Sequence, residues 1–397
     1  MKLEIGFGAA PQMVTIPDEN IMGVLTPNQI EVETIGADAV MSALAAPIGS
    51  EKLCEIVQPG EKIVIITSDI TRPVPSYKIL PFILEELENA GIPDSDITVV
   101  FALGSHRRQT PGEMKKLVGA AVYDRVRCTD GDPGDFVHMG TTTRGTPVDI
   151  TRIVAEADRR IGVGNIEYHY FAGYSGGAKA IMPGVSTRAA IQNNHSRMVL
   201  PEAAAGRLEG NPVREDIEEA LRFCPLDFIV NVVLDEHKEI ICAVAGNAVL
   251  AHRAGCKFLD RLYRKELSAR ADIVIASQGG APKDLNLYQT QKALDNAKHA
   301  VRDGGIIILT GSCKEGLGER VFEEWMTQSE SPAAMIERIG RDFQLGGHKA
   351  AAIGLVLQKA EIYLVSEMPS AFVEKIFLKP FGKVQTALDA AFDQLGK

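Results

Sequence analysis

From Glu61 onward the sequence repeats one pattern: a short apolar run, a polar loop with glycine or proline, and a longer amphipathic segment. This alternation constrains the fold most, because it is typical of strands and helices that alternate along an α/β chain. Residues 61–67 (EKIVIIT) and 96–103 (DITVVFAL) are predicted strands, and residues 76–91 form a predicted helix between them. Since such crossovers join parallel neighbours, we expect mainly parallel sheets.

The same pattern continues to the end of the chain and suggests more than one domain. At roughly 150 residues per domain, 397 residues suggest two or three. We predict two α/β domains with mainly parallel sheets and an interdomain cleft: residues 1–270 and residues 271–380. The last segment, 381–397, contains an amphipathic helix that could pack on either domain. The further elements expected are strands at 160–164, 228–234, 239–244, 271–277, 305–310 and 361–365, and helices at 247–270, 287–302 and 383–395.

Composition excludes several classes of protein. Hydrophobic residues make up 45% and charged residues 24%, so the chain should fold around a core. The net charge is −10 and basic residues form no long run, which argues against nucleic acid as a partner. No apolar stretch reaches the roughly 18 residues of a membrane span, and the start lacks the pattern of a signal peptide. We therefore expect a cytoplasmic protein without membrane contact. The cysteines are scattered and form no metal-binding motif, so we expect ordinary buried thiols: Cys54, Cys128, Cys224, Cys242, Cys256 and Cys313.

Polar side chains follow the first two predicted strands. Asp69 and Arg72 lie in a turn held by two prolines, and an arginine fixed in this way suits a carboxylate ligand. The alternative is a structural Asp–Arg pair that ties down the turn. His106 follows the next strand in G-S-H-R-R, where an imidazole is placed to act as a base. Both loops are expected at the carboxyl edge of the sheet, where ligands of parallel sheets bind.

The segment from Asn165 to Met198 carries the densest pattern. Gly173, Ser175, Gly176 and Gly177 precede Lys179, which suggests backbone amides that approach a phosphate. A P-loop is excluded, because alanines stand where that motif requires glycine and a hydroxyl residue. The apolar neighbours of Lys179 should lower its pKa and make its amine nucleophilic, so we expect a covalent attachment there.

Two histidines flank this segment, His169 before the lysine and His195 after it. Their spacing forms no zinc motif, so a metal held at this place would need ligands from outside the protein. Structural roles as capped or core imidazoles are the alternative for each.

In the second domain, Tyr288, Gln289 and Lys292 lie near the start of a predicted helix, where anions bind favourably. We expect Lys292 and Arg72 to approach one carboxylate from the two domains, with a solvated helical face as the alternative.

Together these motifs resemble the nickel-pincer lactate racemase family, a group of 2-hydroxyacid racemases and epimerases. The resemblance spans both predicted domains and follows the order of the family's motifs. The matching motifs are S-D-I-T-R-P, G-S-H-R, H-Y-F-A-G-Y-S-G-G-A-K-A-I-M-P-G, N-N-H-S and N-L-Y-Q-T-Q-K-A-L-D-N-A.

The resemblance implies an isomerase that inverts the 2-hydroxy carbon of a small 2-hydroxyacid by hydride transfer. It implies that Lys179 carries a pyridinium thioamide/thiocarboxylate mononucleotide, the nickel-pincer nucleotide, and that His195 is the protein ligand of its Ni. His106 and His169 would be the paired acid/base residues. Arg72, Lys292 and Gln289 would bind the carboxylate, with Asp69 and Tyr288 in support. Cofactor-maturation enzymes are the implied partners.

The sequence also departs from lactate racemase itself. Ala178 stands where that enzyme has arginine before the modified lysine, and Trp325 lies too early to be the expected pocket tryptophan. A 2-hydroxyacid other than lactate, larger or more polar, is therefore an equal expectation. The competing function is a nucleotide- or sugar-phosphate-binding protein without redox chemistry, which would use Lys179 but not both histidines. An NAD-dependent dehydrogenase is disfavoured, because no G-x-G-x-x-G joins a strand to a helix.

Overall fold

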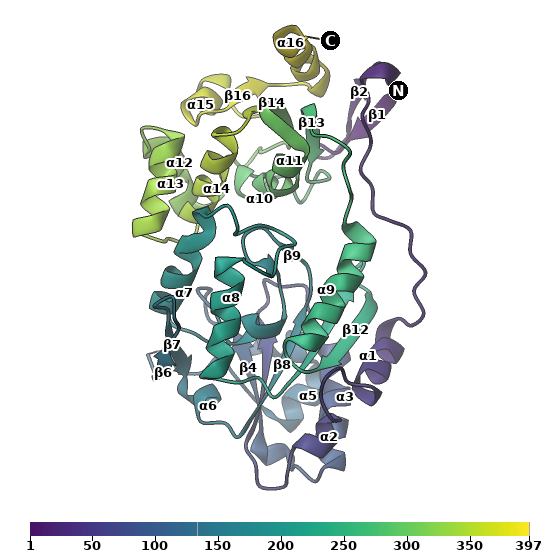
Figure 1. The fold of residues 1–397 in the computed structure, drawn as a ribbon, viewed down its shortest axis with the longest axis vertical. Coiled ribbons are helices and arrows are strands. Elements are labelled where there is room, and N and C mark those ends of the chain that lie inside the picture. Colours follow the sequence, from purple (N-terminus) through teal and green to yellow (C-terminus); the bar gives the residue numbers. More distant parts are fainter. Residues whose placement is uncertain (133, 397) are drawn as a thin grey trace. The chain divides into compact units, whose positions relative to one another are not determined.

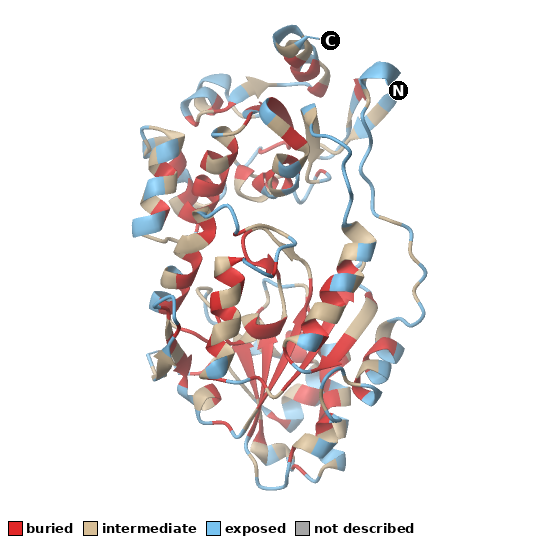
Figure 2. Cartoon of the chain, in the orientation of Figure 1, coloured by how far each residue is buried: buried red, intermediate tan, exposed pale blue. Residues whose placement is uncertain are grey.

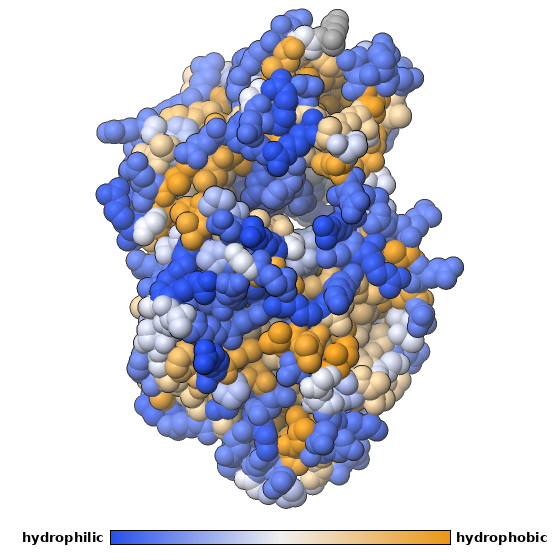
Figure 3. All heavy atoms as spheres, viewed as in Figure 1, coloured by the Kyte–Doolittle hydropathy of each residue, from blue (hydrophilic) through white to orange (hydrophobic). Residues whose placement is uncertain are grey.

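The computed structural model describes residues 1–132 and 134–396, and the chain divides into two compact units (Figure 1). Unit 1 comprises residues 1–26 and 265–397, and unit 2 comprises residues 27–264. No helix in the described residues is both long and apolar enough to cross a membrane. Figure 3 shows hydrophobic residues reaching the surface in small groups among hydrophilic ones.

Unit 2 is built on a six-stranded sheet with the order β12-β11-β8-β3-β4-β5. All neighbouring strands are parallel except β11 and β12, so the expectation of a mainly parallel sheet is confirmed. The central strands are apolar and buried, as expected when helices cover both faces; Figure 2 shows them in red. The strands are β3 (Ile63–Ser68), β4 (Ile97–Ala102), β5 (Arg127–Thr129), β8 (Arg159–Asn165), β11 (Phe228–Leu234) and β12 (Ile240–Gly246).

Helices and two small antiparallel pairs complete unit 2. The helices are α1 (Gly36–Ala45), α2 (Leu53–Ile56), α3 (Ser76–Asn89), α4 (Pro111–Val118), α5 (Ala120–Arg125), α6 (Arg152–Ala155), α7 (Arg188–His195), α8 (Pro212–Glu219) and α9 (Leu250–Tyr263). The strand pairs are β6 (Phe136–Thr141) with β7 (Pro147–Thr151), and β9 (Tyr168–His169) with β10 (Gly173–Tyr174). The 3-10 helices are η2 (Asp94–Asp96), η3 (Gly177–Ala180), η4 (Ser196–Val199) and η5 (Ala220–Arg222).

The strand order reverses at β3. Strand β4 pairs with one side of β3, and β8, which comes later in the chain, pairs with the other side. Such a reversal opens a crevice at the carboxyl ends of the strands, where open α/β sheets bind their ligands. The loop after β3 carries Asp69 and Arg72, the loop after β4 carries His106, and the segment after β8 carries His169. The topology of unit 2 thus places these four residues at one edge of the sheet.

Unit 1 contains a parallel four-stranded sheet with the order β13-β14-β15-β16. Its strands are β13 (Ala271–Ser277), β14 (Val301–Thr310), β15 (Glu361–Val365) and β16 (Lys379–Phe381). Its helices are α10 (Leu287–Thr290), α11 (Leu294–Ala300), α12 (Arg320–Gln328), α13 (Pro332–Arg341), α14 (Gly347–Leu357), α15 (Ser370–Lys375) and α16 (Val384–Leu395), with the 3-10 helices η1 (Asp18–Asn20) and η6 (Gln291–Ala293). In place of the single helix expected over 287–302, the structure has three short consecutive helices, α10, η6 and α11.

The N-terminal segment belongs to unit 1, whereas the sequence analysis assigned it to the domain 1–270. Strands β1 (Lys2–Ile5) and β2 (Gln12–Thr15) form a hairpin, and Val14 is buried in one cluster with Ile306 and Val384. The Thr15 amide also donates to Gln385 Oε1 of α16 at 2.8 Å. Because the apolar face of the hairpin is covered by this helix, residues 1–26 group with 265–397. The terminal helix, which could have packed on either domain, packs within unit 1.

Candidate active site

The ring of Phe171 lies close to three of the predicted site residues of unit 2. The ring centroid of Phe171 lies 4.5 Å from that of His169 and 4.9 Å from that of His195. The Lys179 ammonium lies 6.0 Å from the Phe171 centroid. The structure therefore brings together the expected attachment lysine, one expected acid/base histidine and the expected metal ligand. Phe171 itself was not singled out from the sequence, because a phenylalanine that directly follows Tyr170 carries no distinguishing pattern.

The environment of Lys179 disfavours its charged form. Withdrawal from water, with repulsion from Arg214 and Arg72, holds the pKa of the Lys179 amine well below its usual range. Among the described residues, no hydrogen bond or ion pair to its Nζ atom offsets this effect. A neutral amine is the nucleophilic form of lysine.

Arg214, which affects the pKa of Lys179, was not singled out from the sequence. Its side chain is 0% exposed, and its Nε donates to the carbonyl of Ala172 at 3.1 Å. Its Nη2 donates to the carbonyl of Tyr174. Burial lowers the pKa of this guanidinium to about 10, which leaves it charged near neutral pH. The backbone carbonyls of Ala172 and Tyr174 therefore hold a positively charged side chain in place beside the segment that leads to Lys179.

The glycine-rich loop is shaped by two side chains from distant strands and helices. A Cβ at Gly176, whose φ is +75°, would lie 2.7 Å from Asn231 Oδ1, and one at Gly177, with φ +59°, would lie 2.8 Å from the His252 ring. Glycine is required at both positions because of the positive φ and this close approach. His252 Nε2 also donates to the carbonyl of Ser175 at 2.8 Å.

Several polar groups of this loop are bonded within the protein. The Gly177 amide donates to Asn231 Oδ1 at 2.7 Å, and the Ser175 amide donates to the carbonyl of Glu167 at 2.9 Å. The Ser175 hydroxyl donates to the carbonyl of Asn165 at 2.7 Å and accepts from the Glu167 amide. These groups fix the course of the loop, so a phosphate would find fewer amide donors than the glycine pattern suggests.

His169 is held in a defined tautomer. Its Nδ1 accepts from the Ala172 amide at 3.3 Å, which places the proton of the neutral ring on Nε2. Withdrawal from water, with repulsion from cationic groups that include Arg72 and Arg214, holds the pKa of His169 well below its usual value. The ring is therefore uncharged near neutral pH.

Asp69 and His106 form a carboxylate–imidazole pair. Asp69 Oδ2 lies 2.5 Å from His106 Nδ1, and Asp69 Oδ1 accepts from the Thr71 hydroxyl at 2.7 Å. Burial alone would raise the pKa of Asp69, but the hydrogen bonds from His106 and Thr71, with the charges of His106 and Arg72, hold it below its usual value. The ionised carboxylate accepts the Nδ1 proton, so Nε2 of His106 is the nitrogen that can take up a proton from a ligand.

Arg72 is exposed, and its side chain makes no hydrogen bond or ion pair in the described part of the chain. The alternative of a structural Asp–Arg pair is not what the structure shows, since Asp69 is bonded to His106 and Thr71 instead. The backbone amide of Arg72 does donate to the Asp69 carbonyl at 3.1 Å and closes the turn. The guanidinium is thus available to an anionic ligand.

His195 ends helix α7 and is 8% exposed. Its Nδ1 lies 2.8 Å from Asn194 Oδ1. Across residues 1–132 and 134–396, no group of three or more His, Cys, Asp or Glu side chains could hold a metal ion. The structure therefore offers no ready-made protein cluster for a metal in these residues.

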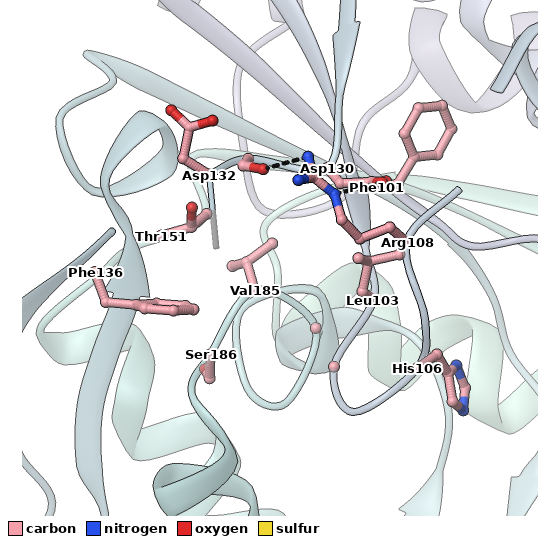
Figure 4. A pocket seen from close by; sticks show the side chains of 13 residues that line it. Phe101, Leu103, His106, Arg108, Asp130, Asp132, Phe136, Thr151, Val185 and Ser186 are labelled. Carbon is pink, nitrogen blue, oxygen red and sulfur yellow. Dashed lines mark hydrogen bonds and ion pairs between the residues drawn. The ribbon is translucent and has the colours of Figure 1, made fainter. Parts of the chain in front are cut away.

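A pocket of about 130 Å³ adjoins His106 (Figure 4). Apolar side chains form part of its wall, and Arg108 and Asp130 supply polar groups. Asp130 Oδ2 accepts from the Gln109 amide at 2.9 Å, and burial raises the pKa of this carboxyl. Figure 4 shows the His106 ring at the edge of this pocket, with its nitrogens turned away from the other labelled side chains.

The remaining predicted residues lie in unit 1. Tyr288 and Gln289 are in α10 and are half-buried, and Lys292 is exposed in η6. The Lys349 ammonium lies 3.9 Å from the centroid of the Tyr288 ring. Trp325 is fully buried, with the Arg338 guanidinium 4.2 Å from its ring centroid, so it is a core residue of unit 1.

Comparison with known proteins identifies the family. The model of the lactate racemase N-terminal domain matches residues 7–206, and that of the lactate racemase C-terminal domain matches residues 267–397. The chain belongs to the lactate racemase family. The predicted resemblance is therefore confirmed, and so is the prediction that the chain is an enzyme of the isomerase class.

Individual relatives agree with this assignment. The chain is 34% identical over 401 residues to the lactate racemase of Thermoanaerobacterium thermosaccharolyticum, with 98% of this chain and 94% of that protein covered. It is 36% identical over 334 residues to the lactate racemase of Lactiplantibacillus plantarum, with 81% and 77% covered. The structure of the lactate racemase apoprotein from T. thermosaccharolyticum matches with a TM-score of 0.87 at 32% identity, covering 100% of this chain and 96% of that one. A Thermotoga maritima protein has the same fold, with a TM-score of 0.62 at 17% identity over 83% of this chain and 89% of that one.

Proposed function

We propose that this chain inverts the 2-hydroxy carbon of a small 2-hydroxyacid with the help of a nickel-pincer nucleotide attached to Lys179. The observation that carries the proposal is the arrangement around Phe171. The rings of His169 and His195 and the ammonium of Lys179 all lie within 6.0 Å of the centroid of the Phe171 ring. Membership in the lactate racemase family supports the reaction type.

The residues present fit such a group. The lowered pKa of Lys179 supplies an amine for covalent attachment. His195 would offer a metal one imidazole, and the bound group would supply the remaining ligands. In this proposal the loop of Gly173, Ser175, Gly176 and Gly177 contributes mainly by its shape, because several of its amides are bonded internally. When bound, the group would accept a hydride from the α-carbon and return it.

The two histidines would move the hydroxyl proton. Inversion requires that the α-hydride leave one face of the carbon and return to the other, so the hydroxyl of each enantiomer needs a base of its own. His169 is uncharged near neutral pH, and Asp69 would stabilise the imidazolium that forms when His106 Nε2 takes up a proton. The chain thus offers one uncharged imidazole and one imidazole paired with a carboxylate.

Arg72 would bind the substrate carboxylate, and Lys292, Gln289 and Tyr288 remain predicted contacts from unit 1. Arg72→Ala is expected to lower kcat/KM by about 100- to 1000-fold, because a bidentate charge-assisted pair is lost. Steady-state racemisation kinetics measure this effect. Arg107→Ala is a matched control, since the Arg107 guanidinium is already paired with Glu113 at 2.6 Å. Unchanged kinetics in Arg72→Ala would show that Arg72 does not bind the substrate carboxylate.

The function is tested on protein coexpressed with cofactor-maturation enzymes. Intact-mass analysis should show a covalent adduct, and a screen of pure 2-hydroxyacid enantiomers, lactate included, should show racemisation or epimerisation of at least one. A nucleotide- or sugar-phosphate-binding protein without redox chemistry would show neither the adduct nor turnover, and that result would overturn the proposal.

A further inference from the structure

Asp216 of helix α8 is a buried carboxylate outside the residues predicted from the sequence. Its side chain is 0% exposed. Oδ1 accepts from the Thr142 hydroxyl at 2.5 Å, and Oδ2 accepts from the Thr146 hydroxyl at 2.6 Å and from Asn194 Nδ2 at 2.7 Å. These three hydrogen bonds, with the Arg197 guanidinium 3.6 Å away, stabilise a charge in the interior.

The partners of Asn194 fix which way its amide points. Its Nδ2 donates to Asp216 Oδ2 and also to the carbonyl of Val213 at 3.1 Å. A carboxylate and a carbonyl can only accept hydrogen bonds, so the NH2 group must face them. The other end of the amide, Oδ1, then faces His195 Nδ1 at 2.8 Å.

This orientation determines where His195 carries its proton. An amide oxygen can only accept, so the imidazole must present a proton on Nδ1. In the neutral ring the lone pair then lies on Nε2, which is the form in which an imidazole ligates a metal through that atom.

We propose that Asn194 and Asp216 are positioning residues that fix His195 in the Nδ1–H tautomer and so make Nε2 the metal ligand. The metal part of this inference rests on the proposed function; the tautomer does not. Without the Asn194 oxygen, both neutral tautomers become accessible, and the ring loses the hydrogen bond that orients it.

The tautomer is measured directly on the full chain without nickel or cofactor. Long-range 1H–15N NMR of protein with 15N-labelled histidine distinguishes the two tautomers at a pH near 8, and His195→Ala assigns the signal. We expect wild type to show the Nδ1–H form, and Asn194→Leu to show a substantial Nε2–H population. Asn193→Leu is the matched control: Asn193 Oδ1 lies 2.7 Å from the same Thr146 hydroxyl, but Asn194 is the residue that holds the His195 ring. It should leave the His195 tautomer unchanged.

An Nε2–H form in wild type, which requires no variant to fold, would overturn the inference. So would a pure Nδ1–H form in Asn194→Leu, provided that thermal unfolding shows the variant to be folded. Asp216→Asn tests the outer residue, because the Val213 carbonyl is then the one remaining partner that requires the NH2 group of Asn194. An unchanged His195 tautomer in this variant would show that the carbonyl suffices and that Asp216 is not a positioning residue.

The second arm measures nickel retention in protein coexpressed with the maturation enzymes. In competition with a chelator, Asn194→Leu should bind nickel about 10- to 100-fold more weakly than wild type, the usual loss of affinity when outer partners of metal ligands are removed. Its covalent adduct mass should be unchanged, and Asn193→Leu should match wild type. Equal nickel loss in Asn194→Leu and wild type would refute the metal part of the inference. A wild type without adduct and nickel would refute the proposed function instead, and the tautomer result would still stand on its own.

Discussion

Lys179→Ala is expected to carry no covalent nucleotide and to show no detectable racemisation, while the fold survives. Lysine is the predicted point of attachment, and alanine offers no nucleophile. The fold should tolerate the change, because no hydrogen bond or ion pair to Lys179 Nζ occurs among the described residues. Removal of an amine whose charged form is disfavoured by its surroundings should not lower the melting temperature. Intact mass, a racemisation assay and thermal unfolding measure the three effects.

Two further variants make this test specific. Lys179→Arg keeps a cationic side chain but removes the reactive amine, so it should behave like Lys179→Ala. Lys116→Ala, at an exposed lysine of helix α4, should retain both adduct and turnover. An adduct of the same mass on Lys179→Ala would show that another residue is the attachment point.

The candidate residues that the sequence singled out are those whose chemistry is visible in the local pattern. Asp69, Arg72 and His106 follow apolar runs, and the carboxyl ends of parallel strands meet at one edge of a sheet. Lys179 stood out because glycines precede it and apolar residues flank it. These patterns extend over fewer than about ten residues, which is the range over which periodicity and turn residues are informative.

What the sequence could not supply are contacts made across the fold. Gly176 and Gly177 suggested a phosphate cradle, but their close packing against Asn231 and His252 is evident only when strand β11 and helix α9 are placed beside the loop. Asp216 likewise looks like an ordinary helical carboxylate until Asn194 is found 2.7 Å from it.

The N-terminal hairpin illustrates the same limit at the level of the fold. Its two strands have four residues each, too few for a reliable alternation, and the surface that covers them is helix α16 at the other end of the chain. Burial of Val14 therefore decides which unit the segment joins, and that burial depends on residues about 370 positions away.

The second large effect is expected at the paired histidines. His106→Ala and His169→Ala should each reduce turnover in both directions by about 100- to 10,000-fold, the usual contribution of a general acid or base. Reversible inversion uses one imidazole as the proton leaves and the other as it returns, so neither can be spared. His106→Ala leaves Asp69 buried with Thr71 as its remaining side-chain hydrogen-bond donor, so His106→Asn, whose amide can still donate to Asp69, is a second variant at that position.

A single-turnover experiment shows whether His106 and His169 act on the same enantiomer or on opposite enantiomers. With each pure enantiomer in turn, a variant that retains the base for that enantiomer can still lose the hydroxyl proton and the α-hydride, and form one equivalent of the 2-oxo acid. If His106 and His169 serve opposite faces, the enantiomer that reacts in the His106 variants should be the one that fails in His169→Ala. Quantifying the 2-oxo acid, with the absorbance of the holoenzyme as a second readout, measures this selectivity. If both variants accept the same enantiomer, or if either keeps full racemisation, the two-base assignment is wrong, and the contacts of one histidine with Asp69 or Phe171 serve the structure alone.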